Sequence, residues 1–541
     1  MKVYRGDFMA QLEKFIKVTQ EQYNTLQAGG TVGSHTGINP NFIYLVENNG
    51  DSEGGTVVEA NPTDEATEQL NTLKVGDTTY SVSNTLAIPA FDLVPETVDE
   101  TTPPLFRVGI DLYYTGINQT KGYLTFTASG FGRDSDWYLM VNTEAQYDGS
   151  LEYSTDAISW TEVTKGAFIY STNSPIYLRG INNTYCKADQ NGQVFSMGYH
   201  SYSEDFSIEC DGNIETLLDY QTVLNGDHPP MAEACFARLF GRCSYLTKAP
   251  ELPTTTLSPY CYQDMFFACP SLTILPELPA TILAEGCYAG MFRACYNLTK
   301  SLKKLPAMTL APKCYYQMFS SCENLTQAPA LPATVLAPYC YEKMFDTCIS
   351  LTITPALPAT ILAEGCYQYM FNYCETLTQA PTILPATTLA ASCYYGMFKQ
   401  CPNLTIAPAL PATTLAEYCY GDMFCACVSL TQASALPATT LAEGCYWGMF
   451  QDCTSLNTLP LLPAETLVDY CYYFMFEGCS SIKLSTTQSA EYPYAYCISA
   501  SEYSEDMSDQ PIDYMFDSTG GSFVGHIELN TTYYTSNEII A

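Results

Sequence analysis

Cysteine is the residue type in this chain whose number and spacing could most directly support chemistry. The sequence has 24 cysteines in 541 residues, and twenty of them form pairs eight residues apart, such as Cys419 and Cys427. Thiolates bind metals and act as nucleophiles, and two nearby thiols can form a disulfide. On a helix, however, a separation of eight residues is about 12 Å, beyond disulfide reach. We therefore interpret these thiols as small buried apolar side chains.

The remaining residues that could support catalysis are scattered. No Gly-x-Ser-x-Gly, phosphate-binding loop or His-Glu-x-x-His motif occurs, and no histidine has metal-ligand spacing to a cysteine or carboxylate. Acidic residues are numerous enough to supply a pair of carboxylates for glycoside hydrolysis, but no motif in the sequence indicates which residues would form such a pair. The sequence therefore predicts a protein without enzymatic activity, cofactor or metal. The four histidines are His35, His200, His228 and His526.

The paired cysteines belong to an internal repeat of 26 or 27 residues with the consensus C-Y-x-x-M-F-x-x-C-x-x-L-T-x-x-P-x-L-P-A-T-x-L-A. A period of this length with regular leucines is typical of leucine-rich repeats. The cysteines that open the units are Cys235, Cys261, Cys287, Cys314, Cys340, Cys366, Cys393, Cys419, Cys445, Cys471 and, in a decayed eleventh unit, Cys497.

Each part of the repeat has a predicted structural role. The block from the first to the second cysteine places apolar residues on one side of a helix of about two turns. The following L-T-x-x-P-x-L-P stretch is extended, because proline keeps the residue before it out of the helical region. One unit cannot bury its apolar stripe alone, whereas stacked units can. Residues 235–497 are therefore expected to form a solenoid of about ten units, with parallel strands and short helices.

This repeat resembles the bacterial leucine-rich repeats described in Treponema and in BspA-like proteins, on the basis of the C-x-x-L…L-P…L…C-Y-x-x-M-F-x-x-C pattern. The stretch LTQAPALPATVLAPYCYEKMF is similar to a Cys/Tyr-rich variant found in gut Bacteroidetes and their phages. The resemblance covers residues 235–497 and implies a binding scaffold used in adhesion or receptor recognition. It does not specify the ligand.

Variable aromatic residues within this repeat are the candidate ligand-binding residues. They occupy the second and third positions after the first cysteine of a unit, off the predicted buried stripe, and stacked copies would form a ladder. Aromatic faces grip sugar rings and protein patches; alternatively, these side chains only cover the convex side of the solenoid. The candidates are Tyr316, Tyr369, Tyr395, Trp447, Tyr473 and Phe474.

The segments before the repeat have a different composition. Residues 1–50, the predicted attachment segment, begin with a predicted amphipathic helix that includes Phe8, Leu12 and Phe15. Within them, the stretch 19–48, TQEQYNTLQAGGTVGSHTGINPNFIYLVEN, resembles the attachment segments of phage fibres. Within residues 51–85, the stretch 55–83 has the pattern A-N-P-x-x-x-A-T-x-x-L-x-x-L-x-V-G-x-x-x-Y-x-V and is similar to a short β-rich element of tailed-phage virion proteins. The Pro-rich, acidic stretch 86–104 is predicted to be a linker.

Alternating apolar residues predict a β-sandwich of immunoglobulin type over residues 105–210. Its predicted strands include 123–128, 151–164, 167–171 and 175–180, and we expect Trp160 and Tyr153 in its core. We also expect residues 211–234 to cap the first repeat and residues 498–541 to cap the last. The expected fold is thus a multidomain chain: an N-terminal helix with small β elements, a sandwich and a solenoid.

Composition restricts the function. With 57 acidic and 22 basic residues, the net charge of −35 disfavours nucleic acid and anionic membranes as partners. No apolar run is long enough to span a bilayer, and no export signal is visible. We therefore expect a tail or head fibre of a tailed phage, made in the host cytoplasm, joined to other virion proteins by residues 1–50, and binding a host surface glycan or protein. Such a fibre implies a homotrimer. The alternatives are a bacterial surface adhesin and a glycan-degrading enzyme.

Overall fold

The computed structural model describes most of the chain after residue 121 and the backbone of nine strands before it. Within these residues the chain is built mostly of strands in several sheets, and α3 (Thr216–Leu224) is the one α-helix. No helix among them has the length and apolar character needed to cross a lipid bilayer. The described residues are 122–130, 136–172, 174–189, 191–199, 205–501, 511–523 and 525–541, together with strands β1 to β9.

Residues 1–122 and 123–541 are two separate compact units. The first unit contains a four-stranded sheet in the order β1-β4-β6-β5, with β1 parallel to β4, and a three-stranded antiparallel sheet β7-β8-β9. Its strands are β1 (Lys14–Thr19), β2 (Thr31–Val32), β3 (His35–Thr36), β4 (Phe42–Glu47), β5 (Thr72–Val75), β6 (Thr78–Val82), β7 (Leu93–Glu96), β8 (Leu105–Val108) and β9 (Asp111–Tyr114).

Two of these strands correct the sequence predictions. The amphipathic helix does not extend through Phe15, because Phe15 lies in β1, whose six residues pair in register with β4. Phe8 and Leu12 lie outside the described residues. In the expected linker 86–104, β7 pairs with β8 from Leu93↔Val108 to Glu96↔Leu105. In both cases a partner strand supplies backbone hydrogen bonds that the composition of the segment itself does not reveal.

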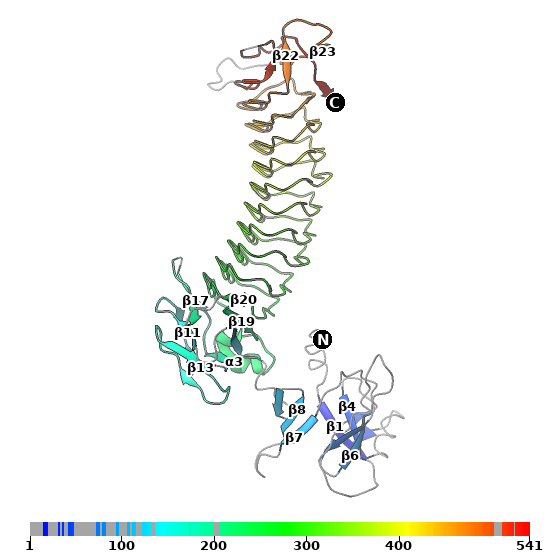
Figure 1. The fold of residues 1–541 in the computed structure, drawn as a ribbon. Helices are drawn as coiled ribbons and strands as arrows, with labels where there is room; N and C mark the ends of the chain where they lie inside the picture. The colour runs from blue at the N-terminus through cyan, green and yellow to red at the C-terminus, as the bar shows by residue number, and fades with distance from the viewer. Residues whose placement is uncertain are drawn as a thin grey trace. The chain divides into compact units, whose positions relative to one another are not determined.

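The second unit begins with two sheets that share one apolar core (Figure 1). One has the order β14-β13-β16-β10-β19-β20 and the other the order β15-β11-β18, with β12 and β17 forming a short pair. The strands are β10 (Leu124–Ser129), β11 (Trp137–Val141), β12 (Gln146–Tyr147), β13 (Ser150–Ser154), β14 (Thr161–Glu162), β15 (Phe168–Ser171), β16 (Ile176–Ile181), β17 (Cys186–Lys187), β18 (Phe195–Tyr199), β19 (Ser207–Asp211) and β20 (Leu246–Lys248).

The predicted strands of this region are confirmed in β10, β13, β15 and β16. Of the two aromatic residues predicted for the core, Tyr153 packs against it while half-buried, whereas Trp160 is not among the core residues. Trp137 is the fully buried tryptophan, at 1% exposure, because it lies on the inner face of the central strand β11. Trp160 is half-buried, with the Arg179 guanidinium 4.0 Å from its ring centroid. Tyr153 is also only half-buried. Both follow the period-two pattern of neighbouring residues, which cannot tell which face of a sheet is covered.

The repeat array, residues 235–497, follows as a stack of similar coils (Figure 1). We number positions within a coil from its first cysteine, which is position 0. The block from position −2 to position 7 is not a helix, as the sequence predicted, but a run of consecutive turns. Every fourth residue has a positive φ, as at Tyr260 (56°), Asp264 (51°) and Ala268 (54°). We call this run the turn block.

Backbone amides of the turn block alternate between two partners. The Gln263 amide donates to the Tyr260 carbonyl at 3.0 Å and closes a turn, whereas the Tyr262 amide donates to Cys287 in the next coil, also at 3.0 Å. The left-handed residues cost on the order of 1 kcal/mol each, and the hydrogen bonds between coils offset this cost. The apolar residues C-Y-x-x-M-F-x-x-C fall at intervals of four, which matches these turns better than the 3.6-residue period of a helix.

Aromatic ladders run along the core of the array. The position 5 phenylalanines stack in parallel, for example Phe266 on Phe292 at 5.6 Å between ring centroids, and the position 1 tyrosines do the same, for example Tyr262 on Tyr288 at 5.7 Å. Each ring is almost fully buried, which stabilises a coil by about 1.5–3 kcal/mol per large apolar side chain. On the extended side, isolated parallel bridges such as Thr388↔Thr414 and Thr414↔Thr440 join successive coils.

Both ends of the array are covered. At the first coil, the Cys186 amide of β17 donates to Cys235 at 2.7 Å, and β19 pairs in parallel with β20. After the tenth coil, residues 511–518 form a further turn block, in which Phe516 stacks on Phe476 at 5.2 Å. Cys497, which the sequence repeat aligned with the first cysteines, lies just after β23 instead. The last strands are β21 (Thr458–Pro460), β22 (Lys483–Ser485), β23 (Tyr494–Tyr496), β24 (Gly520–Gly521), β25 (Tyr533–Thr535) and β26 (Glu538–Ile540).

Candidate functional site

The candidate ligand-binding residues lie on the turn blocks and are all half-buried. Tyr369 and Tyr395 contact each other edge to face, with ring centroids 5.4 Å apart. Trp447, Tyr473 and Phe474 form a second group, with centroid distances of 6.2 Å and 4.2 Å between successive rings. Tyr316 belongs to neither group. The pKa of its hydroxyl is raised, first by burial and then by the nearby charge of Glu342.

The group around Trp447 continues through three residues that the sequence analysis missed. Tyr418 and Tyr470 occupy position −1 of their coils, and Tyr514 lies in the turn block after the array. The rings form one connected chain: Tyr418 to Trp447 at 5.6 Å, Trp447 to Tyr470 at 6.2 Å, Tyr470 to Tyr473 at 5.3 Å, and Phe474 to Tyr514 at 5.1 Å. We call these six residues the C-terminal aromatic cluster: Tyr418, Trp447, Tyr470, Tyr473, Phe474 and Tyr514.

A sequence signal for the missed tyrosines does exist. Tyrosine recurs directly before the first cysteine, at Tyr260, Tyr339, Tyr418 and Tyr470. If the block were a helix, as the sequence predicted, this position would have no particular role. In the turn block it has a positive φ, 56° at Tyr470, and its side chain lies over the following coil. The cluster could therefore be recognised only once the coil geometry was known.

Tyrosines at position −1 are held by the next coil. The Tyr418 hydroxyl donates to Oε1 of Glu443 at 2.9 Å, and its ring lies over Gly444, where an added Cβ would come within 2.3 Å of the ring. Burial and this bond, with the nearby carboxylate charges, raise the pKa of Tyr418 to about 12. The hydroxyl therefore stays protonated at neutral pH, and the ring is held at a fixed angle on the surface.

The other end of the array carries charges that are already paired. Asp264 lies between two arginines, 3.5 Å from Arg238 and 3.2 Å from Arg293. The Arg293 guanidinium also lies 4.4 Å from the centroid of the Phe267 ring. Because cations and anions satisfy each other here, this part of the turn blocks offers less for a charged ligand than the C-terminal part.

The thiols are structural. Every cysteine that the sequence repeat pairs is buried, and the second cysteine of a coil donates to the position 5 carbonyl of the previous coil, as Cys269 does to Phe240 at 3.0 Å and Cys427 to Phe398 at 3.1 Å. Burial raises the pKa of these thiols, to about 12 for Cys295 and Cys401. They are therefore protonated donors. The described residues contain no group of three or more His, Cys, Asp or Glu side chains placed to hold a metal.

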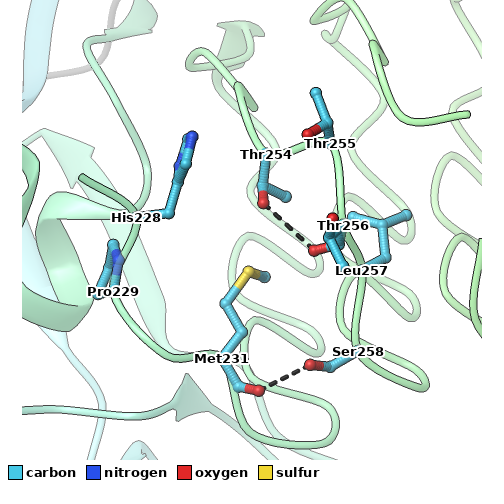
Figure 2. Close-up of a pocket in the computed structure, with 8 residues that line it drawn as sticks. All are labelled: His228, Pro229, Met231, Thr254, Thr255, Thr256, Leu257 and Ser258. Atoms are coloured by element: carbon cyan, nitrogen blue, oxygen red, sulfur yellow. Dashed lines mark hydrogen bonds between the residues drawn. The ribbon is translucent and has the colours of Figure 1, made fainter. Parts of the chain in front are cut away.

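A pocket of about 320 Å³ lies between the segment before the array and its first coil (Figure 2). His228, Pro229 and Met231 line one side, and residues 254–258 line the other. Two of its hydroxyls are used within the chain: Thr254 donates to the Thr256 carbonyl at 3.3 Å and Ser258 to the Met231 carbonyl at 2.7 Å. The Ser258 bond joins the segment before the array to the first coil, and the Thr254 bond lies within that coil.

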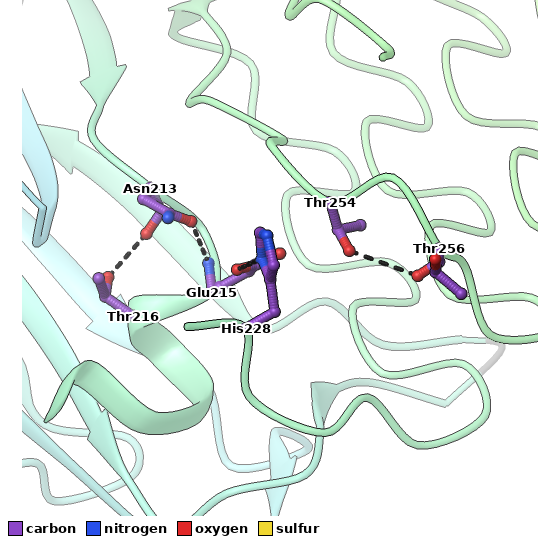
Figure 3. Close-up of polar contacts among 6 residues, drawn as sticks. All are labelled: Asn213, Glu215, Thr216, His228, Thr254 and Thr256. Atoms are coloured by element: carbon purple, nitrogen blue, oxygen red, sulfur yellow. Dashed lines mark hydrogen bonds and ion pairs between the residues drawn. The ribbon is translucent and has the colours of Figure 1, made fainter. Parts of the chain in front are cut away.

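Behind His228 lies a buried carboxylate (Figure 3). Glu215 is 1% exposed, its Oε2 is 2.7 Å from His228 Nδ1, and its Oε1 has no partner among the described residues. An imidazole oriented by a carboxylate is one half of a general-base site. In this pocket the Thr254 and Ser258 hydroxyls donate to the backbone carbonyls of Thr256 and Met231 rather than to the imidazole.

Comparison with protein-family models, with curated proteins and with solved structures found no match to this chain.

Proposed function

We propose that this protein is a non-enzymatic fibre of a tailed-phage virion, on the tail or the capsid, that displays its repeat array to bind a host-cell surface receptor or glycan. In this proposal residues 1–50 attach the protein to other virion proteins, as a homotrimer. The resemblance of those residues to fibre attachment segments, and of the repeats to adhesive leucine-rich repeats, supports the proposal.

The observation that carries this proposal is the C-terminal aromatic cluster. Six rings from successive coils lie in contact on one face of a stack whose coils are joined by backbone hydrogen bonds. Half-buried aromatic side chains on a rigid backbone lose little conformational entropy when a ligand binds. They also present large apolar faces at low desolvation cost, which is typical of binding hot spots.

The proposed architecture is consistent with display. We propose that the repeat array is a leucine-rich-repeat solenoid in which turn blocks replace the usual helices, and that the two sheets of residues 123–211 form an immunoglobulin-like sandwich. The parallel bridges between coils and the common core of the two sheets support these assignments. In a solenoid of this kind each coil contacts its neighbours only, so surface residues can vary without disturbing the core.

Attachment to cells tests the binding face. We expect Trp447→Ala and Tyr473→Ala to reduce attachment of the purified full chain to host cells at least about tenfold, since each truncation of a hot-spot ring costs about 2 kcal/mol. Tyr316→Ala is the matched control, because Tyr316 is half-buried at the same coil position as both residues but belongs to neither ring group. Unchanged attachment of both cluster variants would remove this face as the binding surface.

Particle assembly tests the anchor. We expect virions assembled with a chain that lacks residues 1–50 to carry none of it, whereas the full-length chain reaches normal occupancy. Full occupancy of the truncated chain would show that the attachment assignment is wrong.

A further inference from the structure

Charge is distributed unevenly along the array and its C-terminal cap. Residues 235–399 contain ten basic and nine acidic side chains, whereas residues 400–541 contain sixteen acidic side chains and one lysine, Lys483. The C-terminal aromatic cluster lies within the acidic part. A ligand of this surface therefore meets a negative potential, which attracts cations and repels phosphates, sulfates and uronic acids.

Three of these carboxylates are stacked beside the cluster. Position −2 is acidic in three consecutive coils, at Glu417, Glu443 and Asp469. Backbone hydrogen bonds hold these coils in register: the Tyr418 amide donates to the Glu443 carbonyl at 2.9 Å, and the Gly444 amide donates to the Asp469 carbonyl at 3.0 Å. Earlier in the array the same position is interrupted by uncharged residues, with Glu285 lying between Pro259 and Pro312.

Each of these carboxylates acts on the same aromatic residue. The charges of Glu443, Glu417 and Asp469 all contribute to the raised pKa of Tyr418, after burial and the Glu443 hydrogen bond. None of the three makes an ion pair with a Lys, Arg or His of the described residues. Oδ1 of Asp469 is buried without a hydrogen-bond partner among those residues. Like charges thus lie together here, and no Lys, Arg or His in the part of the chain that the structure describes pairs with them.

Aromatic faces and carboxylates attract the same kind of group. An ammonium ion over a ring face gains about 0.5–2 kcal/mol, and a carboxylate alongside adds a charge-assisted hydrogen bond. The rings recur from coil to coil, with centroid distances of 5.1 Å to 6.2 Å. A linear polymer with a cationic group on successive units can contact several rings and carboxylates at once. A single lysine side chain can contact only one ring and its neighbouring carboxylate.

We propose that the C-terminal aromatic cluster, together with Glu417, Glu443 and Asp469, binds a glycan that carries free amino groups. Its sugar faces stack on the rings, and its ammonium groups pair with the three carboxylates. This inference rests on the proposed function, since it names the ligand class of the same recognition surface.

Two matched oligosaccharides test the proposal with the purified full chain. They are the hexamer of glucosamine, whose amino groups are free, and the hexamer of N-acetylglucosamine, which has similar sugar rings and no charge. At about pH 6, where amines of this type are protonated, we expect the glucosamine hexamer to bind at least about tenfold more tightly by calorimetry. We expect added salt to weaken this preference, because it screens exposed charges.

Variants separate the charges from the rings. The triple variant Glu417→Gln, Glu443→Gln and Asp469→Asn should lose the preference for the free amine, since glutamine and asparagine keep the side-chain shape. The control is the double variant Glu285→Gln and Glu364→Gln. These two glutamates occupy the same coil position and also accept a hydrogen bond from a tyrosine hydroxyl, but they lie away from the cluster. It should keep the preference. Circular dichroism and the melting temperature check that all variants are folded.

Three outcomes would overturn the inference: equal affinity for the two hexamers, an unchanged preference in the triple variant, or a lysine-rich peptide of equal charge binding as tightly as the glucosamine hexamer. A cell-attachment assay distinguishes this failure from failure of the proposed function. If the full chain attaches to host cells and the triple variant attaches equally well, the ligand class is wrong and the binding role stands. If the full chain attaches to no host cell, the proposed function itself is wrong.

Discussion

The hydroxyl of Tyr418 donates a hydrogen bond of 2.9 Å to Oε1 of Glu443, one coil further along the array. The same relationship joins Tyr260 to Glu285 at 2.5 Å, and it recurs between Tyr339 and Glu364. The pairs are three coils apart, and each tyrosine ring lies over the glycine that follows its glutamate. Neighbouring coils are therefore locked at their surface as well as in their core.

The glycine beneath the ring gives the first prediction. At Gly444, with a φ of 55°, an added Cβ would lie 2.3 Å from the Tyr418 ring, whereas at Gly226, with a φ of 88°, it would meet nothing within 4 Å. Gly444→Ala should therefore destabilise the protein by about 2–4 kcal/mol, through strain and overpacking together. Gly226→Ala should cost about 1 kcal/mol from strain alone. Urea unfolding measures both, and equal losses would contradict the packing role.

A buried thiol gives the second prediction. Cys427 donates to the Phe398 carbonyl at 3.1 Å, whereas its neighbour Cys425 makes only a 3.7 Å contact with Gln451. Cys427→Ala should lower the free energy of unfolding by about 1–3 kcal/mol, because the carbonyl loses a donor. Cys425→Ala is the matched control and should cost less. If Cys425→Ala were the more damaging change in urea unfolding, the thiol hydrogen bonds would not be what stabilises the stack.

Thiol accessibility gives the third prediction. Cys497 is half-buried, and the other 23 cysteines are buried. A thiol reagent should therefore modify about one thiol per native chain within minutes, and all 24 after denaturation. A Cys497→Ser chain, which removes the one accessible thiol, should react negligibly in its native state. Rapid modification of several thiols in the folded protein would mean that the coils are not closely stacked.

Alkaline pH gives the fourth prediction. Burial raises the pKa of Cys295 and of Cys401 to about 12, whereas an unfolded cysteine titrates near 8.5. Below the unfolded value the thiols are protonated in both states, so stability does not depend on them. Above it the unfolded state loses protons that the folded state keeps, and stability falls by about 1.4 kcal/mol per pH unit for each thiol. The urea midpoint should thus be steady to about pH 8 and fall steeply above pH 9.

The control for this pH dependence lies in the chain. Replacing Cys295 and Cys401 by alanine removes two of the titrating groups, so the decline above pH 9 should become measurably shallower than in the native sequence. An identical slope in the two proteins would assign the alkaline instability to other groups, such as the remaining buried thiols or the buried tyrosines at position 1 of the coils.

The sequence by itself determined the repeat, its register and its core. The period of 26 or 27 residues fixes which cysteine, tyrosine, methionine and phenylalanine lie beside their counterparts, and these side chains are buried in all nine coils that begin between Cys261 and Cys471. This works because a repeated apolar pattern can be buried only by stacking on itself. Strands β10, β13, β15 and β16 were predictable for a similar reason, since alternation of apolar residues marks a covered sheet face.

Only the tertiary structure decided the local conformation of the coils and the composition of the site. Half of the amides in a turn block have their partners in the next coil, as the Tyr262 amide does at Cys287, so turns are favoured over a helix only when that coil is present. For the same reason residues 511–518, rather than the segment around Cys497, continue the stack. Tyr418 and Tyr470 join Trp447 through contacts between coils. The recurrence of tyrosine before the first cysteine marks their position, but only the geometry of the coils shows that these rings meet.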